Sequence, residues 1–145
     1  MERSAFSKGR RCACGNVRLA SRAITQFYDR CLRPSGLRST QFSLLLNIFL
    51  HDNISVGELA DLLVMDQTTV SRNLEGLKEK QYIVIRQEKG DARKKLLSVT
   101  PAGITTLRET MPLWENAQEH IENGLGRDRF QELLKMLADL NLLTK

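Results

Sequence analysis

The feature that most constrains the fold is a pair of helix-start signals close together in the middle of the chain. Ser55 and Glu58 match a capping box, in which the serine side chain and the glutamate side chain each bond the other residue's backbone amide. Asp66 is a second capping residue, and the helix after it is predicted to run to about Lys80. Only residues 63–66 join the two helices, so this segment is predicted to be a helix-turn-helix.

A β-hairpin is predicted directly after the second of these helices. Residues 82–85 and 96–99 are short stretches rich in apolar and β-branched side chains, and the polar loop 88–95 between them contains Gly90. Together with a buried helix before it, this arrangement makes residues 39–100 a candidate winged helix-turn-helix lobe, in which the hairpin is the wing.

Longer amphipathic helices are predicted on both sides of this lobe. Apolar residues recur there every three or four positions, and proline and glycine mark the helix ends. The predicted helices cover residues 12–31, 39–50, 101–123 and 127–143. The predicted fold class is therefore mainly α with a small β-hairpin wing, a winged helix-turn-helix with helical extensions at both ends.

The helix after Asp66 has an apolar and a polar face. At about 100° per residue, Val70, Leu74 and Leu77 fall on one side and are predicted to pack on the core. The polar side carries short hydrogen-bonding residues near the helix start, which suit contact with base edges in the major groove of DNA. The candidate DNA-binding residues on this helix are Gln67, Thr68, Thr69, Ser71 and Arg72. An ordinary solvated helix face is the alternative interpretation.

The hairpin carries a compact group of cations, Arg93, Lys94 and Lys95. A cationic wing suits the negative potential of the minor groove and the DNA phosphates. Asp91 is predicted to brace Arg93 through a salt bridge. The alternative is that these cations only protect the hairpin edge from pairing with other strands.

Charge and motifs narrow the function classes. The net charge is +5, and the first forty residues hold nine Lys/Arg against two Asp/Glu, which favours a polyanionic partner. The chain has no phosphate-binding glycine loop, no hydrolase or metalloprotease motif and no clustered metal ligands, so we expect neither an enzyme nor a cofactor or metal site. It has no apolar stretch long enough for a membrane span or a signal peptide, so we expect a cytoplasmic protein.

Several stretches of the chain resemble the MarR family of bacterial regulators. They include Asp66 to Leu74, Asp91 to Arg93, and Leu97 to Gly103. The resemblance implies one MarR-like domain over residues 1–145, with residues 39–100 as the DNA-binding lobe and residues 12–33 and 101–143 as a helical dimerisation region. It also implies DNA contacts from the start of the 66–76 helix and from a wing arginine, here Arg93.

The outer helices carry apolar residues that one small subunit cannot cover. Ala23, Ile24 and Phe27 belong to the first helix, and a leucine stripe runs along the last one. A homodimer on a palindromic operator would bury both, whereas a monomer with a helical cap is the alternative.

The resemblance also implies a possible small aromatic or anionic effector between the dimer helices and the lobe. The candidate pocket residues are Phe27, Phe42, Leu46, Met111 and Trp114. These residues can also be explained as core residues at helical spacing, and we favour this interpretation over a pocket.

Cys14 is a candidate redox site, since arginines and a helix start raise the reactivity of a thiol. Its position is similar to that of the reactive cysteine in the organic-hydroperoxide sensors of the family, and Tyr28 matches a tyrosine that partners it there. The odd number of cysteines, three, does not indicate a disulfide framework.

The sequence therefore predicts a sequence-specific regulator that binds double-stranded DNA. We expect a repressor that a small molecule or an oxidative signal releases. The alternative is a winged-helix module for protein–protein contact without operator binding.

Overall fold

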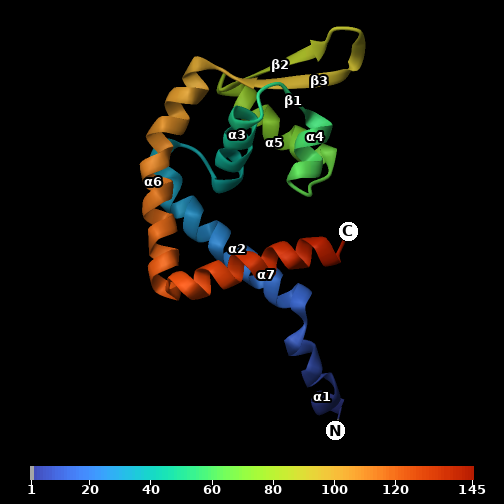
Figure 1. Ribbon diagram of the computed structural model, residues 1–145, viewed down its shortest axis with the longest axis vertical. Helices are drawn as coiled ribbons and strands as arrows, with labels where there is room; N and C mark the ends of the chain where they lie inside the picture. Colours follow the sequence, from blue (N-terminus) through green and yellow to red (C-terminus); the bar gives the residue numbers. More distant parts are fainter. Residues whose placement is uncertain (1) are drawn as a thin grey trace.

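The computed structural model describes residues 2–145 and is dominated by helices (Figure 1). The elements are α1 (Glu2–Ala5), the 3-10 helix η1 (Phe6–Arg11), α2 (Ala13–Leu32), the 3-10 helix η2 (Arg33–Ser35), α3 (Ser39–Leu50), β1 (Ile54–Ser55), α4 (Val56–Leu62), α5 (Gln67–Glu79), β2 (Ile83–Glu88), β3 (Asp91–Val99), α6 (Pro101–Leu125) and α7 (Arg127–Leu143). This order confirms the predicted fold class, a mainly α winged helix-turn-helix with helices on both sides of the lobe.

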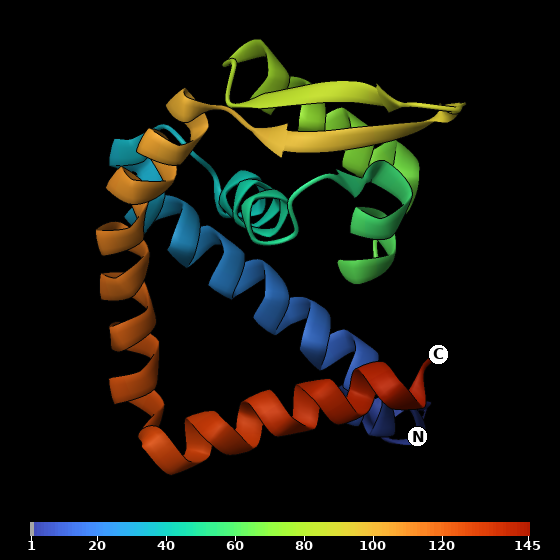
Figure 2. The ribbon, with the colours of Figure 1, turned by 45° about the horizontal axis from the view of Figure 1, so that its top comes forward.

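The long helices form an open frame, and the lobe sits at one end of it (Figure 2). Helix α6 descends from the wing to a corner with α7, and α2 crosses the frame from the lobe toward the N-terminus. The segment before α2 lies at the far end from the wing (Figure 1). This arrangement leaves the wing and α5 on an outer surface of the molecule.

The core lies inside the lobe. Side chains from α3, α4, α5 and the sheet meet there, among them Leu45, Leu59, Leu74 and Leu97, each 1 % exposed or less. Leu62 on α4 is apolar but 47 % exposed. At about 100° per residue it lies roughly 100° away from the stripe that α4 buries, so the buried face of this short helix is narrow.

The small sheet differs from the prediction in two ways. It has three antiparallel strands in the order β1-β3-β2, and the two-residue strand β1 was not predicted. The predicted loop 88–95 was also too long, because β2 continues to Glu88 and β3 begins at Asp91. Backbone pairing of Gln87 with Lys95 extends the strands into this polar stretch. Both side chains are exposed, so no apolar pattern marks the residues as strand.

The start of α6 fixes the frame to the sheet. Thr100 caps the helix: its hydroxyl accepts from the Gly103 amide at 3.1 Å and donates to the Gln81 carbonyl at 2.7 Å. The Thr100 amide in turn donates to the Tyr82 carbonyl at 3.0 Å. The helix then continues to Leu125, past Pro112.

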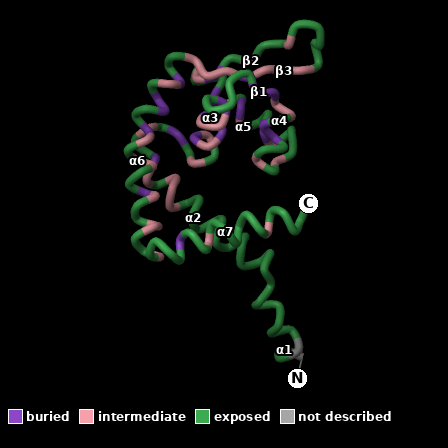
Figure 3. Tube along the Cα trace, in the orientation of Figure 1, coloured by how far each residue is buried: buried purple, intermediate pink, exposed green. Residues whose placement is uncertain are grey.

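Figure 3 shows that buried residues become sparse beyond the lobe, along α2 and α7.

Candidate nucleic-acid interface

The start of α5 is held by its capping residue. The Asp66 carboxylate accepts from the Thr69 amide at 2.9 Å and from the Thr69 hydroxyl at 2.7 Å. Both bonds lower the pKa of Asp66 below its usual value, and the bond from the hydroxyl contributes most. The predicted cap is confirmed, and it commits the Thr69 side chain to the helix start.

The two faces of α5 lie as the helical wheel predicts. Val70, Leu74 and Leu77 are 0 %, 1 % and 0 % exposed, so they anchor the helix in the core. On the outer side, Gln67 and Ser71 are exposed and lie one helical turn apart, and Thr68 and Arg72 form a second exposed pair beside them. Thr69 is half-buried. The first two turns of α5 therefore present four polar side chains to solvent.

The wing contains a bulge at its cationic end. Gln87 pairs with Lys95, whereas the next residue, Glu88, pairs with Asp91, so residues 92–94 have no partner opposite them in β2. The tight turn that joins the strands uses Gly90 at φ 92°, a left-handed conformation that suits glycine. A bulge redirects side chains from the usual alternation of a strand, and here it affects two of the three predicted cations.

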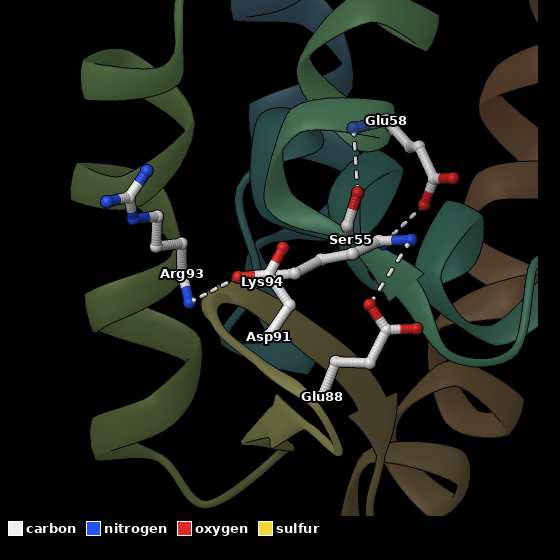
Figure 4. Close-up of polar contacts among 6 residues, drawn as sticks. All are labelled: Ser55, Glu58, Glu88, Asp91, Arg93 and Lys94. Carbon is white, nitrogen blue, oxygen red and sulfur yellow. Dashed lines mark hydrogen bonds and ion pairs between the residues drawn. The ribbon is translucent and has the colours of Figure 1, made fainter.

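Asp91 stabilises this bulge in a different way from the one predicted. Its carboxylate accepts from the backbone amide of Arg93 at 3.0 Å (Figure 4). The predicted salt bridge to the Arg93 side chain is not formed among the described residues, because the carboxylate lies next to the backbone two residues on. Asp91 therefore shapes the wing backbone, and the guanidinium extends toward α5 (Figure 4).

The Lys94 side chain extends from the wing toward the capping box of α4 (Figure 4). The Lys94 ammonium is 3.5 Å from the Glu88 carboxylate. The Glu58 carboxylate accepts from the Ser55 amide at 2.8 Å, and the Ser55 hydroxyl accepts from the Glu58 amide at 3.1 Å. The bonds with Ser55 lower the pKa of Glu58, and the charge of Lys94 adds a smaller contribution.

The wing and α5 share one cleft of about 470 Å³. It is lined by Gln67 and Ser71 from α5, by Asp91, Arg93, Lys94 and Lys95 from the wing, and by Ser55, Val56 and Gly57 from the start of α4. The structure thus brings the three predicted wing cations together with two of the predicted α5 residues. Thr68 and Arg72 lie on the outward side of α5, beside the residues that line this cleft.

The contribution of α4 to the cleft was not predicted. A Cβ atom on Gly57 would lie 3.4 Å from the Gln67 side-chain nitrogen, so the two residues are close neighbours. The capping box at Ser55 was a signal that a helix begins here. Its proximity to the wing depends on the pairing of Ser55 with Leu96, which connects residues far apart in the sequence.

The five candidate effector-pocket residues fall into two groups. Phe42 belongs to the buried core, and Leu46, Met111 and Trp114 pack against that core. The rings of Phe42 and Trp114 are 6.3 Å apart. Phe27 instead lies 5.1 Å from the His120 ring, where α2 meets α6. Four of the five therefore belong to or pack on the core of the lobe, whereas Phe27 lies outside that cluster.

Cys14 and Tyr28 do not meet within one chain. Both lie on α2, fourteen positions apart, which corresponds to about 21 Å along a helix axis. Cys14 is exposed. The Tyr28 hydroxyl donates to the Gln118 side chain at 2.7 Å, and burial, with smaller contributions from Cys31 and Glu122, raises the pKa of Tyr28.

Within residues 2–145, no helix is long and apolar enough to cross a membrane. The same part of the chain holds no group of three or more side chains placed to bind a metal ion.

Comparisons with known proteins agree with this geometry. Residues 35–94 match the family model described as the MarR family. The M. tuberculosis transcriptional regulator MosR, solved in complex with DNA, is 34 % identical, with 92 % of this chain and 98 % of that chain covered and a TM-score of 0.80. Another structure of MosR is 31 % identical, covering 96 % of this chain and 97 % of that chain, with a TM-score of 0.82.

A more distant structure shares the same fold. A mutant MarR from E. coli, complexed with operator DNA, is 20 % identical over 86 % of this chain and 89 % of that chain, with a TM-score of 0.79. The family match, the similarity to MosR over nearly the whole chain and the winged lobe agree with one another. The chain therefore belongs to the MarR family of winged helix-turn-helix transcriptional regulators.

Proposed function

We propose that this chain binds double-stranded DNA at specific sequences, with the start of α5 in the major groove and the wing at the minor groove. The observation that carries this proposal is the cleft shared by Gln67, Ser71 and the wing cations. A groove-binding helix and a cationic hairpin on one surface can contact two adjacent grooves and the phosphates between them. The MosR structure in complex with DNA supports the proposal.

Each exposed residue has a role that follows from its chemistry. Arg72 can donate two parallel bonds to guanine, and Gln67 can pair with adenine. Thr68, Thr69 and Ser71 supply hydroxyls for bases or phosphates, although the Thr69 hydroxyl already donates to Asp66. Arg93, Lys94 and Lys95 supply positive charge for the wing contacts. Residues 39–100 would thus form the DNA-binding lobe.

We infer that the active form is a homodimer on a palindromic operator. Leu134, Leu137 and Leu143 on α7 are 46 %, 39 % and 80 % exposed, and Ile24 on α2 is 41 % exposed. A second copy that buries these side chains would place two α5 helices on neighbouring half-sites. The helical regions 12–33 and 101–143 would then form the dimer interface, and all of residues 1–145 would act as one domain.

The proposed role is repression in the cytoplasm, ended by a small molecule or an oxidant. One feature supports a signal at the helical frame. Cys14 is exposed at the second position of α2, where an oxidant can reach it. Tyr28 would contribute to sensing only from another subunit, because about 21 Å of helix separates it from Cys14 in its own chain. An aromatic effector would have to displace the packing of Trp114 or Phe27.

The alternative, a winged-helix module that binds another protein, is favoured less by the site. The cleft at this site is lined by three cations, one carboxylate (Asp91) and two polar α5 side chains. This net positive lining suits a phosphate backbone better than a protein surface. We therefore retain DNA as the proposed partner.

The test is selection of bound duplexes from a random pool with the purified full chain. The proposal predicts enrichment of one palindromic sequence whose half-sites lie about one helical turn apart. The proposal would be overturned in favour of a protein partner if the selection enriched no sequence and the wild-type chain also failed to bind random duplex at low salt.

A further inference from the structure

The wing contains the one ion pair within 4.0 Å that the described residues form, between Lys94 and Glu88. The two side chains are 40 % and 38 % exposed, so the pair lies at the surface. Lys94 also lies close enough to Glu58 for its charge to lower the pKa of that carboxyl. One of the three wing cations is therefore already associated with acidic groups of the same chain.

Arg93 and Lys94 are neighbours in sequence but extend in different directions (Figure 4). The guanidinium of Arg93 extends toward α5, while the ammonium of Lys94 extends back toward Glu88 and the capping box of α4. Neighbouring side chains of a strand point to opposite faces, and Arg93 and Lys94 keep this divergence within the bulge over residues 92–94. The wing thus separates an arginine that faces the recognition helix from a lysine that faces carboxylates.

We propose that Glu88 restrains Lys94 and thereby sets the effective positive charge that the wing offers to DNA. This inference rests on the proposed function, DNA binding. In the restrained state Arg93 and Lys95 provide the wing's phosphate contacts, and Lys94 contributes less than either. Because phosphate contacts act on any sequence, restraint of one lysine lowers the affinity for every duplex, random DNA included.

Two effects must be separated in any test of Glu88. Loss of its carboxylate would release Lys94, but it would also remove a negative charge that repels DNA directly. The first effect requires Lys94, whereas the second does not. A double-mutant cycle with Glu88→Gln and Lys94→Gln therefore distinguishes them.

The experiment measures binding of the wild type, Glu88→Gln, Lys94→Gln and the double variant to a random-sequence duplex across a salt series. We expect Glu88→Gln to raise affinity about two- to fivefold, the range of an exposed ion pair, and to steepen the log–log salt slope by up to ~0.9, one phosphate contact. In the Lys94→Gln background, Glu88→Gln should keep only the smaller gain in affinity that comes from lost repulsion, and the increase in salt slope should be lost.

A matched control is Glu75→Gln, which removes an exposed carboxylate from α5. Its effect on random-DNA affinity should be the same with Lys94 present or replaced, because it acts by repulsion alone. The thermal unfolding midpoints of all variants should be measured alongside. They should differ from that of the wild type only slightly, because a surface ion pair contributes little to stability.

An equal gain from Glu88→Gln in both backgrounds would overturn the proposal, as would no change or a loss of affinity with Lys94 present. Either result leaves DNA binding by the wild type intact. If the wild type itself does not bind duplex DNA at low salt, the proposed function fails as well, so the two failures are distinguishable.

Discussion

At the scale of single residues, Gly103 shows how a small side chain fixes the position of a long helix. It lies in the first turn of α6, and a Cβ atom there would collide with the Tyr82 carbonyl oxygen and lie 2.6 Å from a methyl carbon of Val99. The obstruction is backbone, which cannot move aside without breaking the Tyr82 bond to the Thr100 amide. Close packing of α6 on the sheet therefore requires glycine at this position.

We expect Gly103→Ala to lower the free energy of unfolding by about 1–3 kcal/mol or more, the cost of overpacking a tight site. Gly124→Ala is the matched control, because Gly124 is in the same helix and has nothing within 4 Å of its added Cβ. That control should gain up to ~1 kcal/mol from helix propensity. Urea unfolding of both variants checks the prediction, and equal stability of the two would contradict it.

At the scale of elements, the start of α3 is capped by a residue from another helix. The Asp29 carboxylate on α2 accepts from the Ser39 amide and the Ser39 hydroxyl, both at 2.7 Å. Burial acts to raise the pKa of Asp29, but the bonds from Ser39 and the nearby charge of Arg38 outweigh it and lower the pKa below 3.8. This contact links the helical frame to the DNA-binding lobe.

The lowered pKa gives this contact a pH dependence. Because the folded pKa lies below the unfolded value of 3.8, the stabilisation is present above about pH 4 and is lost as the pH falls through the folded pKa. Asp29→Asn, whose amide oxygen still accepts from Ser39, should be about 1 kcal/mol less stable than the wild type at pH 7, and this gap should close toward pH 3. Thermal unfolding from pH 7 to pH 3 measures it.

The control for this series is Asp52→Asn, in the exposed turn after α3. Its difference from the wild type should stay small and flat across the same range. A gap for Asp29→Asn that is constant or widens as the pH falls would contradict the assignment.

Local signals predicted most elements because local bonds define their ends. Ser55, Asp66 and Thr100 each cap a helix within three residues of sequence, so these starts were predictable. Strand β1 was not, because it consists of two residues whose pairing with Leu96 and Leu97 involves a distant segment. The bulge over residues 92–94 and the Lys94–Glu88 contact were also missed, since both depend on how the two strands pair.

At the scale of the whole molecule, the frame has little buried core and exposes apolar side chains along two helices. Leu19 on α2 and Leu142 on α7 are 61 % and 68 % exposed. The lobe also exposes apolar residues, among them Leu50 and Val64, but it has its own buried core. Apolar residues exposed along a helix are typical of an interaction surface, and on the frame this is the surface that the proposed homodimer would bury.

We expect Leu137→Glu to convert the proposed dimer into a monomer, because a buried charge on the α7 stripe has no partner there. Light scattering with size-exclusion chromatography measures the mass, and operator affinity should fall at the same time. Gln131→Glu adds the same charge to an exposed position about 120° away on α7 and should leave the dimer intact. A wild type that is monomeric at micromolar concentration would contradict the proposed assembly.

The measurement that tests the proposed interface most directly is a comparison of Arg72→Ala and Arg93→Ala on the selected operator and on a random duplex. The account predicts that Arg72→Ala weakens operator binding by about 1–3 kcal/mol with little change on random DNA, since its contacts are to bases. Arg93→Ala should weaken both, with a shallower salt slope. Unchanged affinity of both variants for both duplexes at moderate salt would contradict the assignment of α5 and the wing as the DNA-binding surface.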